Sequence, residues 1–188
     1  QCPVVWDAEA VCPVWCEWLE EMQPDAAVRD FLQELAGYVL VPGVNYHAFF
    51  FLYGDGGTGK STFTDVLSAL VGDGNWMALQ LEELGNAFAR KGLVGKQMYL
   101  CGQLTRQSFK HIGLIKQIAS GEPIHVDVKH GEAFTYSPTG RFVMTSNVHA
   151  ATPDTSGGFE RRFMQVTWER VVPEEERDYE LGDRLRGN

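Results

Sequence analysis

The chain has 188 residues, of which 44% are apolar, 22% are charged and 12% are aromatic. This length and composition predict one globular domain with its own core, and they exclude a disordered or collagen-like chain. Its apolar runs fall short of the roughly 18 residues that a membrane span needs, so we expect no membrane association. The chain opens with Gln1, without an initiator Met or a signal-peptide pattern, and we interpret it as a piece of a longer protein.

The net charge of −9 is unevenly distributed along the chain. Residues 1–84 carry −11, whereas residues 85–130 carry seven basic and two acidic side chains, a charge of +5. Residues 131–188 carry −3. The basic middle segment is compatible with a local site for a polyanion, although most runs of charge simply lie on a solvated face.

The four cysteines, Cys2, Cys12, Cys16 and Cys101, lack the paired spacing of a zinc site. Cys12 and Cys16 are one helical turn apart, and no second pair matches them. We therefore expect reduced thiols in a cytosolic core.

Helices and strands are predicted in alternation along the chain. Apolar residues recur at helical spacing in 14–22 and 25–40, and Pro42-Gly43 ends the second helix. An almost unbroken apolar run at 46–53 is typical of a strand buried on both faces of a parallel sheet. The later elements that we expect are a helix at 60–71, a strand at 97–101, a helix at 108–119, strands at 141–145 and 163–168, and a helical tail from 173. This alternation predicts a three-layer α/β domain.

Residues 123–137 interrupt the alternation. Apolar and polar side chains alternate in 124–128, Gly131 follows, and a second short strand pattern occupies 133–136. We interpret this segment as a β-hairpin inserted into the α/β order.

Residues 54–61, Gly-Asp-Gly-Gly-Thr-Gly-Lys-Ser, match the phosphate-loop pattern G-x-x-x-x-G-K-[ST] at every fixed position. Glycines let backbone N–H groups point at a phosphate chain, and the helix that starts near Lys60 adds its positive dipole end. We expect a nucleoside triphosphate here, with Lys60 on its β and γ phosphates and Ser61 on Mg²⁺. The predicted contacts are Gly54, Asp55, Gly56, Gly57, Thr58, Gly59, Lys60, Ser61 and Thr62.

Two further candidate sites follow along the chain. Asn147 comes directly after the strand at 141–145, where an amide can contact a γ phosphate or orient the attacking water. Arg161 and Arg162 directly precede the last strand, where an arginine can cross a subunit boundary to neutralise charge in phosphoryl transfer. Taken alone, each residue is equally compatible with an ordinary surface position.

Together these segments resemble the motifs of superfamily 3 helicases, and in particular the C-terminal helicase domain of phage and plasmid primase–helicases. The matching segments are 54–61 (motif A), 98–103 (motif B), 124–136 (motif B′), 142–147 (motif C) and 161–163 (the arginine). The resemblance implies an AAA+-like P-loop NTPase fold with a parallel central sheet, an inserted β-hairpin and a small N-terminal helical segment. It also implies a homo-oligomeric, hexameric ring that uses ATP and Mg²⁺ to translocate on single-stranded DNA during replication.

The resemblance also implies roles for individual residues. Lys129 and His130, at the turn of the hairpin, match the positions that hold the DNA backbone in such rings, and a lysine at a loop tip meets phosphate at little desolvation cost. Lys116 is a further candidate for contact with DNA or a neighbouring subunit. Arg162 takes the role of the arginine finger, with Arg161 as second choice. Asn147 becomes the sensor of the γ phosphate.

The expected organisation has three parts. An N-terminal helical segment occupies 1–44, an ATPase core occupies 45–170 with the DNA-binding hairpin near 123–137, and 171–188 is the start of a truncated C-terminal helical region. A primase domain in the same polypeptide is an expected partner. The resemblance places the protein in the cytoplasm of a bacterial host, as a phage or mobile-element protein.

The sequence departs from the family at one catalytic position. Gln103 stands where the family has Asp or Glu, and a glutamine cannot act as a base or bring negative charge to the metal site. We therefore expect ATP–Mg²⁺ to bind and to be hydrolysed slowly or not at all. The glutamine is either natural or an engineered acid-to-amide substitution. An alignment in which Glu82 or Glu83 supplies the carboxylate is less favoured.

Two other functions compete with the helicase hypothesis. The main alternative is a non-hydrolysing ATP-binding module that assembles or loads a phage replisome. A small-molecule P-loop kinase ranks last, because no substrate-binding lid is evident and the hairpin and the arginine pair would have no role.

Overall fold

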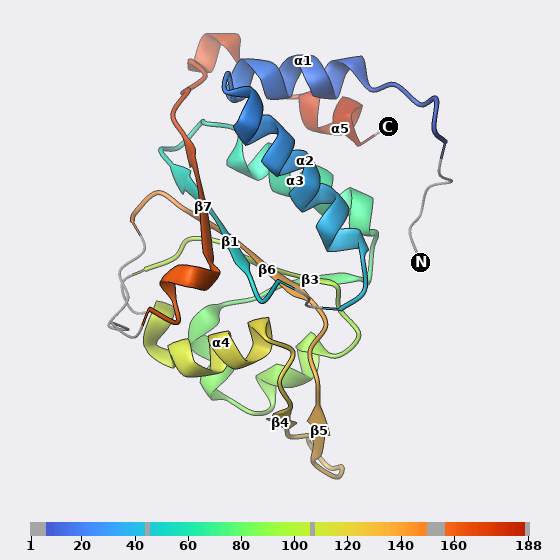
Figure 1. Ribbon diagram of the computed structural model, residues 1–188, viewed down its shortest axis with the longest axis vertical. Helices are drawn as coiled ribbons and strands as arrows, with labels where there is room; N and C mark the ends of the chain where they lie inside the picture. The colour runs from blue at the N-terminus through green and yellow to red at the C-terminus, as the bar shows by residue number, and fades with distance from the viewer. Residues whose placement is uncertain (1–6, 44–45, 106–107, 150–156, 187–188) are drawn as a thin grey trace.

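The computed structural model describes residues 7–43, 46–105, 108–149 and 157–186. Its centre is a five-stranded sheet in the order β2-β3-β6-β1-β7, in which all neighbouring strands are parallel. The strands are β1 (Phe49–Gly54), β2 (Trp76–Ala78), β3 (Met98–Cys101), β6 (Arg141–Ser146) and β7 (Phe163–Trp168). Helices cover both faces of the sheet (Figure 1), which confirms the predicted three-layer α/β fold with a parallel central sheet.

Strand β1 lies between β6 and β7, and its side chains serve two cores. Phe49 and Phe51 point to one face of the sheet, and Phe50 and Leu52 point to the other. Because successive side chains of a strand alternate between faces, a strand covered on both sides is apolar throughout. The strand begins three residues later than predicted, and Tyr46 is 77% exposed.

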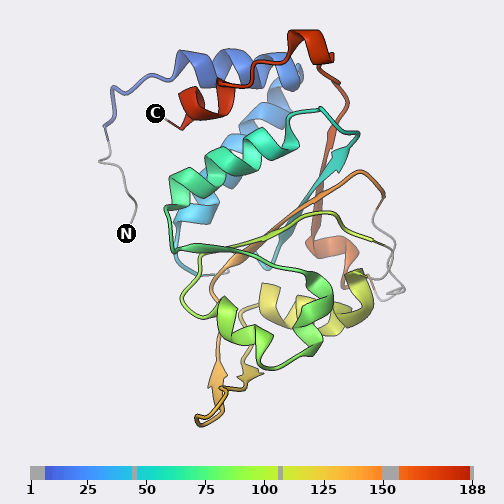
Figure 2. The same cartoon turned by 180° about the vertical axis from the view of Figure 1, so that it is seen from behind.

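Four helices lie on one face of the sheet: α1 (Pro13–Met22), α2 (Ala26–Leu40), α3 (Lys60–Val71) and α5 (Leu181–Leu185) (Figures 1 and 2). The first three confirm predicted helices. Asp25 caps α2, because its carboxylate accepts a hydrogen bond from the backbone N–H of Ala27 at 2.9 Å. The apolar sides of α1, α2 and α3 share one core with Phe50 and Leu52, so the N-terminal helices pack directly on the sheet.

The other face carries α4 (Ile112–Ala119) and three short 3₁₀ segments, Leu81–Gly85, Ala89–Leu93 and Ser108–His111. The predicted helix at 108–119 is therefore a 3₁₀ turn followed by an α-helix, with the junction at His111. The 3₁₀ segments and the three-residue strand β2 were not predicted, because each is too short to show a periodic apolar pattern.

The inserted hairpin consists of β4 (Ile124–Val126) and β5 (Phe134–Tyr136), which pair antiparallel outside the main sheet. Figure 1 shows it projecting from the body at the end opposite α1. Ile124 and Val126 are buried at its base, and the hydroxyl of Tyr136 accepts a hydrogen bond from the Gly95 N–H at 3.0 Å. The predicted hairpin is confirmed, and its base is fixed while its turn is exposed.

Two expectations about the rest of the chain need correction. The tail is not continuously helical: its described part, residues 173–186, contains a 3₁₀ turn at Glu174–Glu176 and the short helix α5. Cys101 is buried, but Cys12 and Cys16 are exposed and do not belong to the core, and Cys2 lies outside the described residues. Within the described ranges, no cluster of three or more His, Cys, Asp or Glu side chains could hold a metal ion, and no helix is long and apolar enough to cross a bilayer.

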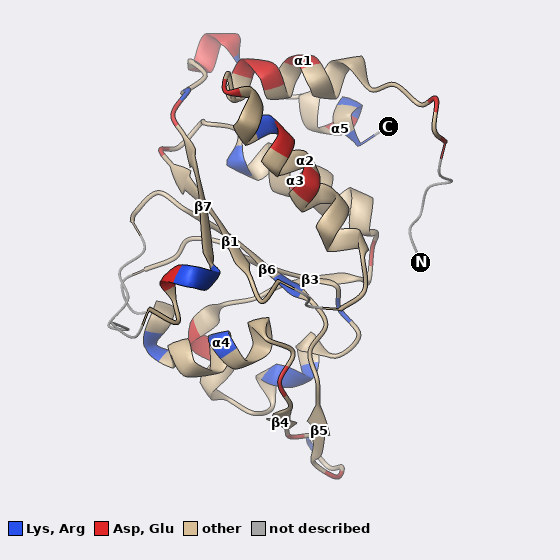
Figure 3. Ribbon diagram, viewed as in Figure 1, with Lys and Arg blue, Asp and Glu red and all other residues tan. Residues whose placement is uncertain are grey.

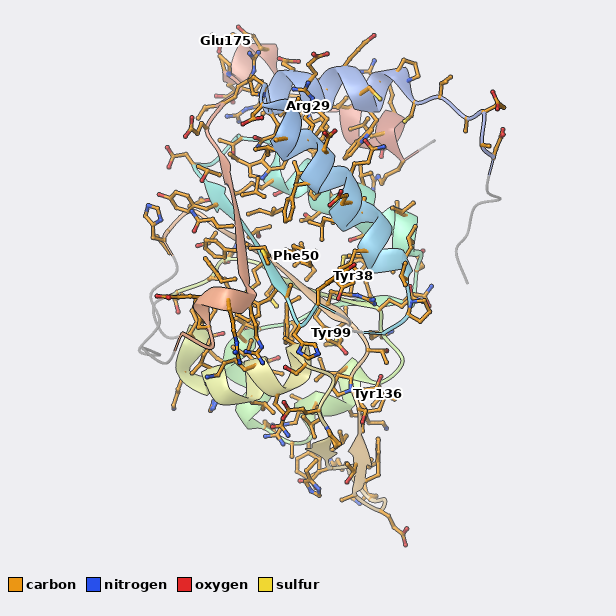
Figure 4. The ribbon with its side chains drawn as sticks, in the orientation of Figure 1. Arg29, Tyr38, Phe50, Tyr99, Tyr136 and Glu175 are labelled. Atoms are coloured by element: carbon orange, nitrogen blue, oxygen red, sulfur yellow. The ribbon has the colours of Figure 1, made fainter. Side chains whose placement is uncertain are left out.

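A buried arginine joins the end of α2 to the sheet. Arg141, at the start of β6, is 1% exposed, and its guanidinium carbon lies 4.4 Å from the ring centroid of Tyr38. The guanidinium donates to the carbonyl oxygens of Thr139, at 3.0 Å, and of Gly43. Burial lowers the pKa of Arg141, and Tyr38 partly opposes this shift. Figure 4 shows Tyr38 beside Phe50, between α2 and the sheet.

This contact gives a prediction for stability. Arg141→Ala removes the hydrogen bonds to Thr139 and Gly43 and opens a void against Tyr38, so we expect the free energy of unfolding to fall by about 2–4 kcal/mol. Arg170→Ala is the matched control, because Arg170 pairs with Glu21 at an exposed site and its loss should cost less than about 1 kcal/mol. Urea denaturation measures both, and equal effects would contradict this account.

Candidate functional site

A cavity of about 700 Å³ lies at the carboxyl ends of β1, β3 and β6. Parallel strands end at the same edge of a sheet, so the segments that follow them meet there. Its lining includes loop residues 56–62 after β1, Gln103 after β3 and Asn147 after β6. The structure thus brings together the phosphate loop and two of the predicted catalytic positions in one cavity.

The phosphate loop has the backbone geometry that its glycines allow. Gly57 and Gly59 have φ angles of 79° and 82°, in the left-handed region that other residues rarely adopt. Gly54 lies against β7, where a Cβ would collide with the carbonyl oxygen of Trp168. Thr58 closes the turn, because its hydroxyl donates to the carbonyl oxygen of Asp55 at 2.8 Å.

Lys60 is folded over its own loop. Lys60 is 7% exposed, and its ammonium donates to the carbonyl oxygens of Gly54 and Asp55, each at 2.6 Å, and to the Thr58 hydroxyl at 3.0 Å. Burial lowers the pKa of Lys60, and the charge of Asp55 opposes this shift. The ammonium is therefore held by neutral loop oxygens at the start of α3, where the helix dipole favours an anion.

Gln103 and Asn147 are both exposed and line the cavity from neighbouring strands. Gln103 has a φ of 54°, an unusual value for a residue other than glycine, and such strained positions cluster at functional sites. Ser146 orders the turn before Asn147, since its Oγ donates to the carbonyl oxygen of Val148 at 2.8 Å and accepts from the Val148 N–H at 3.0 Å.

Glu82 does not line this cavity. Its Oε1 accepts hydrogen bonds from the hydroxyls of Ser108, at 2.6 Å, and Thr105, at 3.4 Å. The bond from Ser108 is the main reason that the pKa of Glu82 is lowered. Among the lining residues that the structure describes, the one carboxylate is Asp178, and its two oxygens accept from Arg184 and from the Glu180 N–H. Glu82 thus lies near Gln103 through Thr105, but among the described lining residues no carboxylate other than that of Asp178 faces the cavity.

The arginine pair lies away from the cavity. Arg161, Arg162 and Lys116 line a second depression of about 550 Å³ beside α4. Arg162 is half-buried and donates to the carbonyl oxygen of Gly158 at 2.9 Å and to the Ser120 hydroxyl at 3.1 Å, whereas Arg161 is exposed. Figure 3 shows this basic region around α4 and the start of β7. Within one chain, these arginines do not reach the phosphate loop.

Lys129 and His130 occupy the turn of the hairpin, and both are exposed. His130 has a φ of 59°, and the Gly131 N–H closes the turn on the carbonyl oxygen of Val128 at 3.1 Å. The neighbouring Glu132 is also exposed, so Lys129 is a single positive charge beside an acid rather than part of a basic patch. The structure separates this turn from the cavity.

Sequence reasoning missed several lining residues. Trp18 and Met22 come from α1, and Val172, Arg177, Asp178, Tyr179 and Leu181 come from the segment after β7. The Val172 N–H donates to the carbonyl oxygen of Gly57 at 3.0 Å, so this segment lies directly on the phosphate loop. No local sequence pattern predicts this contact, because Val172 and Gly57 are 115 positions apart.

The loop geometry gives a prediction with an internal control. Gly59→Ala places a Cβ at a φ of 82° and 3.1 Å from the Trp18 ring, so we expect it to lower the free energy of unfolding by about 1–2 kcal/mol. Gly56→Ala meets no atom within 4 Å and has no left-handed φ, so its stability should stay within about 0.5 kcal/mol of the unmodified chain. Thermal denaturation distinguishes the two, and a fully tolerated Gly59→Ala would contradict the assigned geometry.

Comparison with solved structures supports the fold. An apo structure of the NrS-1 C-terminal region aligns with a TM-score of 0.79 and 17% identity, over 98% of this chain and 45% of that one. An X-ray structure of JCV helicase aligns with a TM-score of 0.59 and 12% identity, over 94% of this chain and 51% of that one. An inhibitor-bound structure of JCV helicase aligns with a TM-score of 0.58 and 15% identity, over 95% of this chain and 52% of that one.

The chain spans about half the length of these structures, and at such identities the likeness establishes the fold. The fold is shared with a helicase, as the sequence resemblance implied. A family model matches residues 52–162, which is more than half of the chain and includes the phosphate loop, Gln103, the hairpin and Asn147. The chain belongs to DUF5906, a family of unknown function.

Proposed function

We propose that this chain is the ATP-binding core of a superfamily 3 DNA helicase that works as a homo-oligomeric, hexameric ring on single-stranded DNA. The observation that carries the proposal is the convergence of the phosphate loop, Gln103 and Asn147 on one cavity at the carboxyl edge of the sheet. The match of each segment to a motif and the meeting of the three segments in space are independent lines of support, because the segments are far apart in the sequence.

The residues present fit a nucleoside triphosphate with Mg²⁺. Lys60 exchanges the carbonyl oxygens of Gly54 and Asp55 for phosphate oxygens, and the N–H groups of the loop bind the same phosphates. Ser61, exposed in the first turn of α3, is placed to supply a hydroxyl ligand to Mg²⁺. When bound, the metal supplies charge neutralisation for the developing phosphoryl group.

Hydrolysis needs a residue that receives the proton of the attacking water. Asn147 orients that water through its amide, but Gln103 cannot accept the proton. We propose that the arginine of a neighbouring subunit neutralises the charge of the transferred phosphoryl group; it cannot replace the missing proton acceptor. The exposure of Arg161 supports it as the residue that reaches across, with Arg162 holding the segment through Ser120 and Gly158. This reverses the order of preference that the sequence resemblance implied.

DNA contact is assigned to the hairpin. Its fixed base and exposed turn suit an element that points into a ring channel, with Lys129 against a phosphate and His130 against a phosphate or a base. Lys116, on α4, lines the same depression as the arginines, which favours a contact between subunits over one with DNA.

Gln103 also favours a second function, a non-hydrolysing ATP-binding module that assembles or loads a replisome. In that function nucleotide binding changes the oligomeric state, and no acid is needed at position 103 because ATP is not hydrolysed. One substitution separates the two functions.

Gln103→Glu restores a carboxylate at the cavity, and we expect ATP hydrolysis stimulated by single-stranded DNA to rise at least about 100-fold, the usual contribution of a general base. Gln33→Glu is the matched control, because Gln33 is exposed on α2, outside the cavity and outside the depression that holds the arginines. Steady-state phosphate release measures the rates. If ATP binds and Gln103→Glu stays as inactive as Gln33→Glu, the helicase function is wrong and the assembly module takes its place.

The hairpin assignment gives a separate prediction. Lys129→Ala should weaken binding of single-stranded DNA and reduce its salt dependence, since each lost phosphate contact lowers the counterion release. Lys110→Ala removes the same charge from an exposed position in the 3₁₀ segment Ser108–His111 and should leave both unchanged. Fluorescence anisotropy at two or more salt concentrations tests the pair. Equal losses of DNA affinity in the two variants would contradict the assignment of DNA contact to the hairpin.

A further inference from the structure

The segment after β7 turns back over the phosphate loop. We call residues 172–181 the strap. The hydrogen bond from the Val172 N–H to the Gly57 carbonyl oxygen begins it, and Leu181 ends it against the core. Beyond the strap, α5 packs on α1 and α3, as Figure 2 shows. The strap is therefore fixed at both ends across the mouth of the cavity.

Arg177 is the residue of the strap that meets the loop. Its Nη2 lies 2.8 Å from the position that a Cβ on Gly57 would occupy, so the absence of a side chain at Gly57 makes room for the guanidinium. Its Nε donates to the carbonyl oxygen of Val172 at 3.1 Å, which fixes the direction of the side chain. Arg177 is exposed and lines the same cavity as Lys60 and Ser61.

The guanidinium retains unused donors. In the described part of the chain, the bond from Nε to Val172 is its one hydrogen bond, and both Nη groups are without an acceptor. The adjacent Asp178 is already paired with Arg184. Lys60 and Arg177 are the two cationic side chains among the described lining residues. A planar guanidinium with free N–H groups beside a phosphate loop has the geometry for bidentate contact with phosphate oxygens.

We propose that Arg177 is a ligand of the nucleotide's phosphate chain, contributed by the same subunit as the phosphate loop. The inference rests on the proposed function in one respect, that the cavity takes a nucleoside polyphosphate. Arg177 then adds a second positive charge to the cavity that Lys60 lines, and the uncharged Gln103 does not offset it. Because it faces the phosphates, it favours ATP and ADP over AMP.

The test compares the binding of ATP, ADP and AMP, each with Mg²⁺, by calorimetry or by competition with a fluorescent ATP analogue. We expect Arg177→Ala to weaken ATP binding roughly 10- to 100-fold, the scale of a lost charged hydrogen bond, with little change for AMP. Arg177→Lys, which keeps the charge without the fork, should fall between. Arg186→Ala is the matched control, since Arg186 follows α5, pairs with Asp183 and lies outside the cavity lining.

Other outcomes overturn the proposal. If Arg177→Ala weakens ATP and AMP equally and lowers the melting temperature without nucleotide, Arg177 only holds the strap. If it behaves as Arg186→Ala does, it touches no phosphate. Lys60→Ala separates this failure from that of the proposed function: an unmodified chain that binds no ATP, or binds it independently of Lys60, refutes the nucleotide site itself.

Discussion

All strands of the central sheet run in one direction, and the rest of the molecule depends on this constraint. A parallel sheet collects the carboxyl ends of its strands at a single edge, so segments that lie far apart in the sequence become neighbours. The loop after β1, Gln103 after β3 and Asn147 after β6 meet there. The parallel arrangement in turn requires helices on both faces, which explains the unbroken apolar sequence of β1.

The cavity at that edge is electrostatically prepared for an anion. The start of α3 and the ammonium of Lys60 provide positive potential, and the buried ammonium has only neutral oxygens as hydrogen-bond partners. The one carboxylate among the described lining residues, Asp178, is neutralised by Arg184. Burial of the ammonium carries a desolvation cost that the charge of Asp55 only partly opposes, and a phosphate at this position would reduce that cost. Under the proposed function, binding and hydrolysis are thus separable: the groups that suit a phosphate line the cavity, and Gln103 stands where the resemblance implies an acid.

Features encoded by adjacent residues could be predicted from the sequence, and features set by distant contacts could not. The phosphate loop, the cap at Asp25 and the hairpin each follow from a local pattern. The start of β1 was placed too early because the aromatic side chain of Tyr46 extends the apolar pattern beyond the buried strand. Strand β2, whose residues are Trp, Met and Ala, shows no alternation of apolar and polar side chains.

The residues of the candidate site likewise include some that local motifs predicted and some that depend on distant contacts. Lys60, Gln103 and Asn147 were identified from motifs, and the fold brings them together. The strap was missed because its contact with Gly57 depends on a chain reversal after β7. The difference between Arg161 and Arg162 was likewise invisible, since it depends on the hydroxyl of Ser120, 42 positions before Arg162. The sequence motif identifies both arginines, and only the tertiary structure shows that Arg162 is hydrogen-bonded whereas Arg161 is exposed.

The most direct test of the account is a crystal structure of this chain with a non-hydrolysable ATP analogue and Mg²⁺. The account predicts the phosphates on the N–H groups of residues 56–61, with the Lys60 ammonium moved from the carbonyl oxygens of Gly54 and Asp55 onto phosphate oxygens. A nucleotide bound elsewhere, with Lys60 still hydrogen-bonded to its own loop, would contradict it.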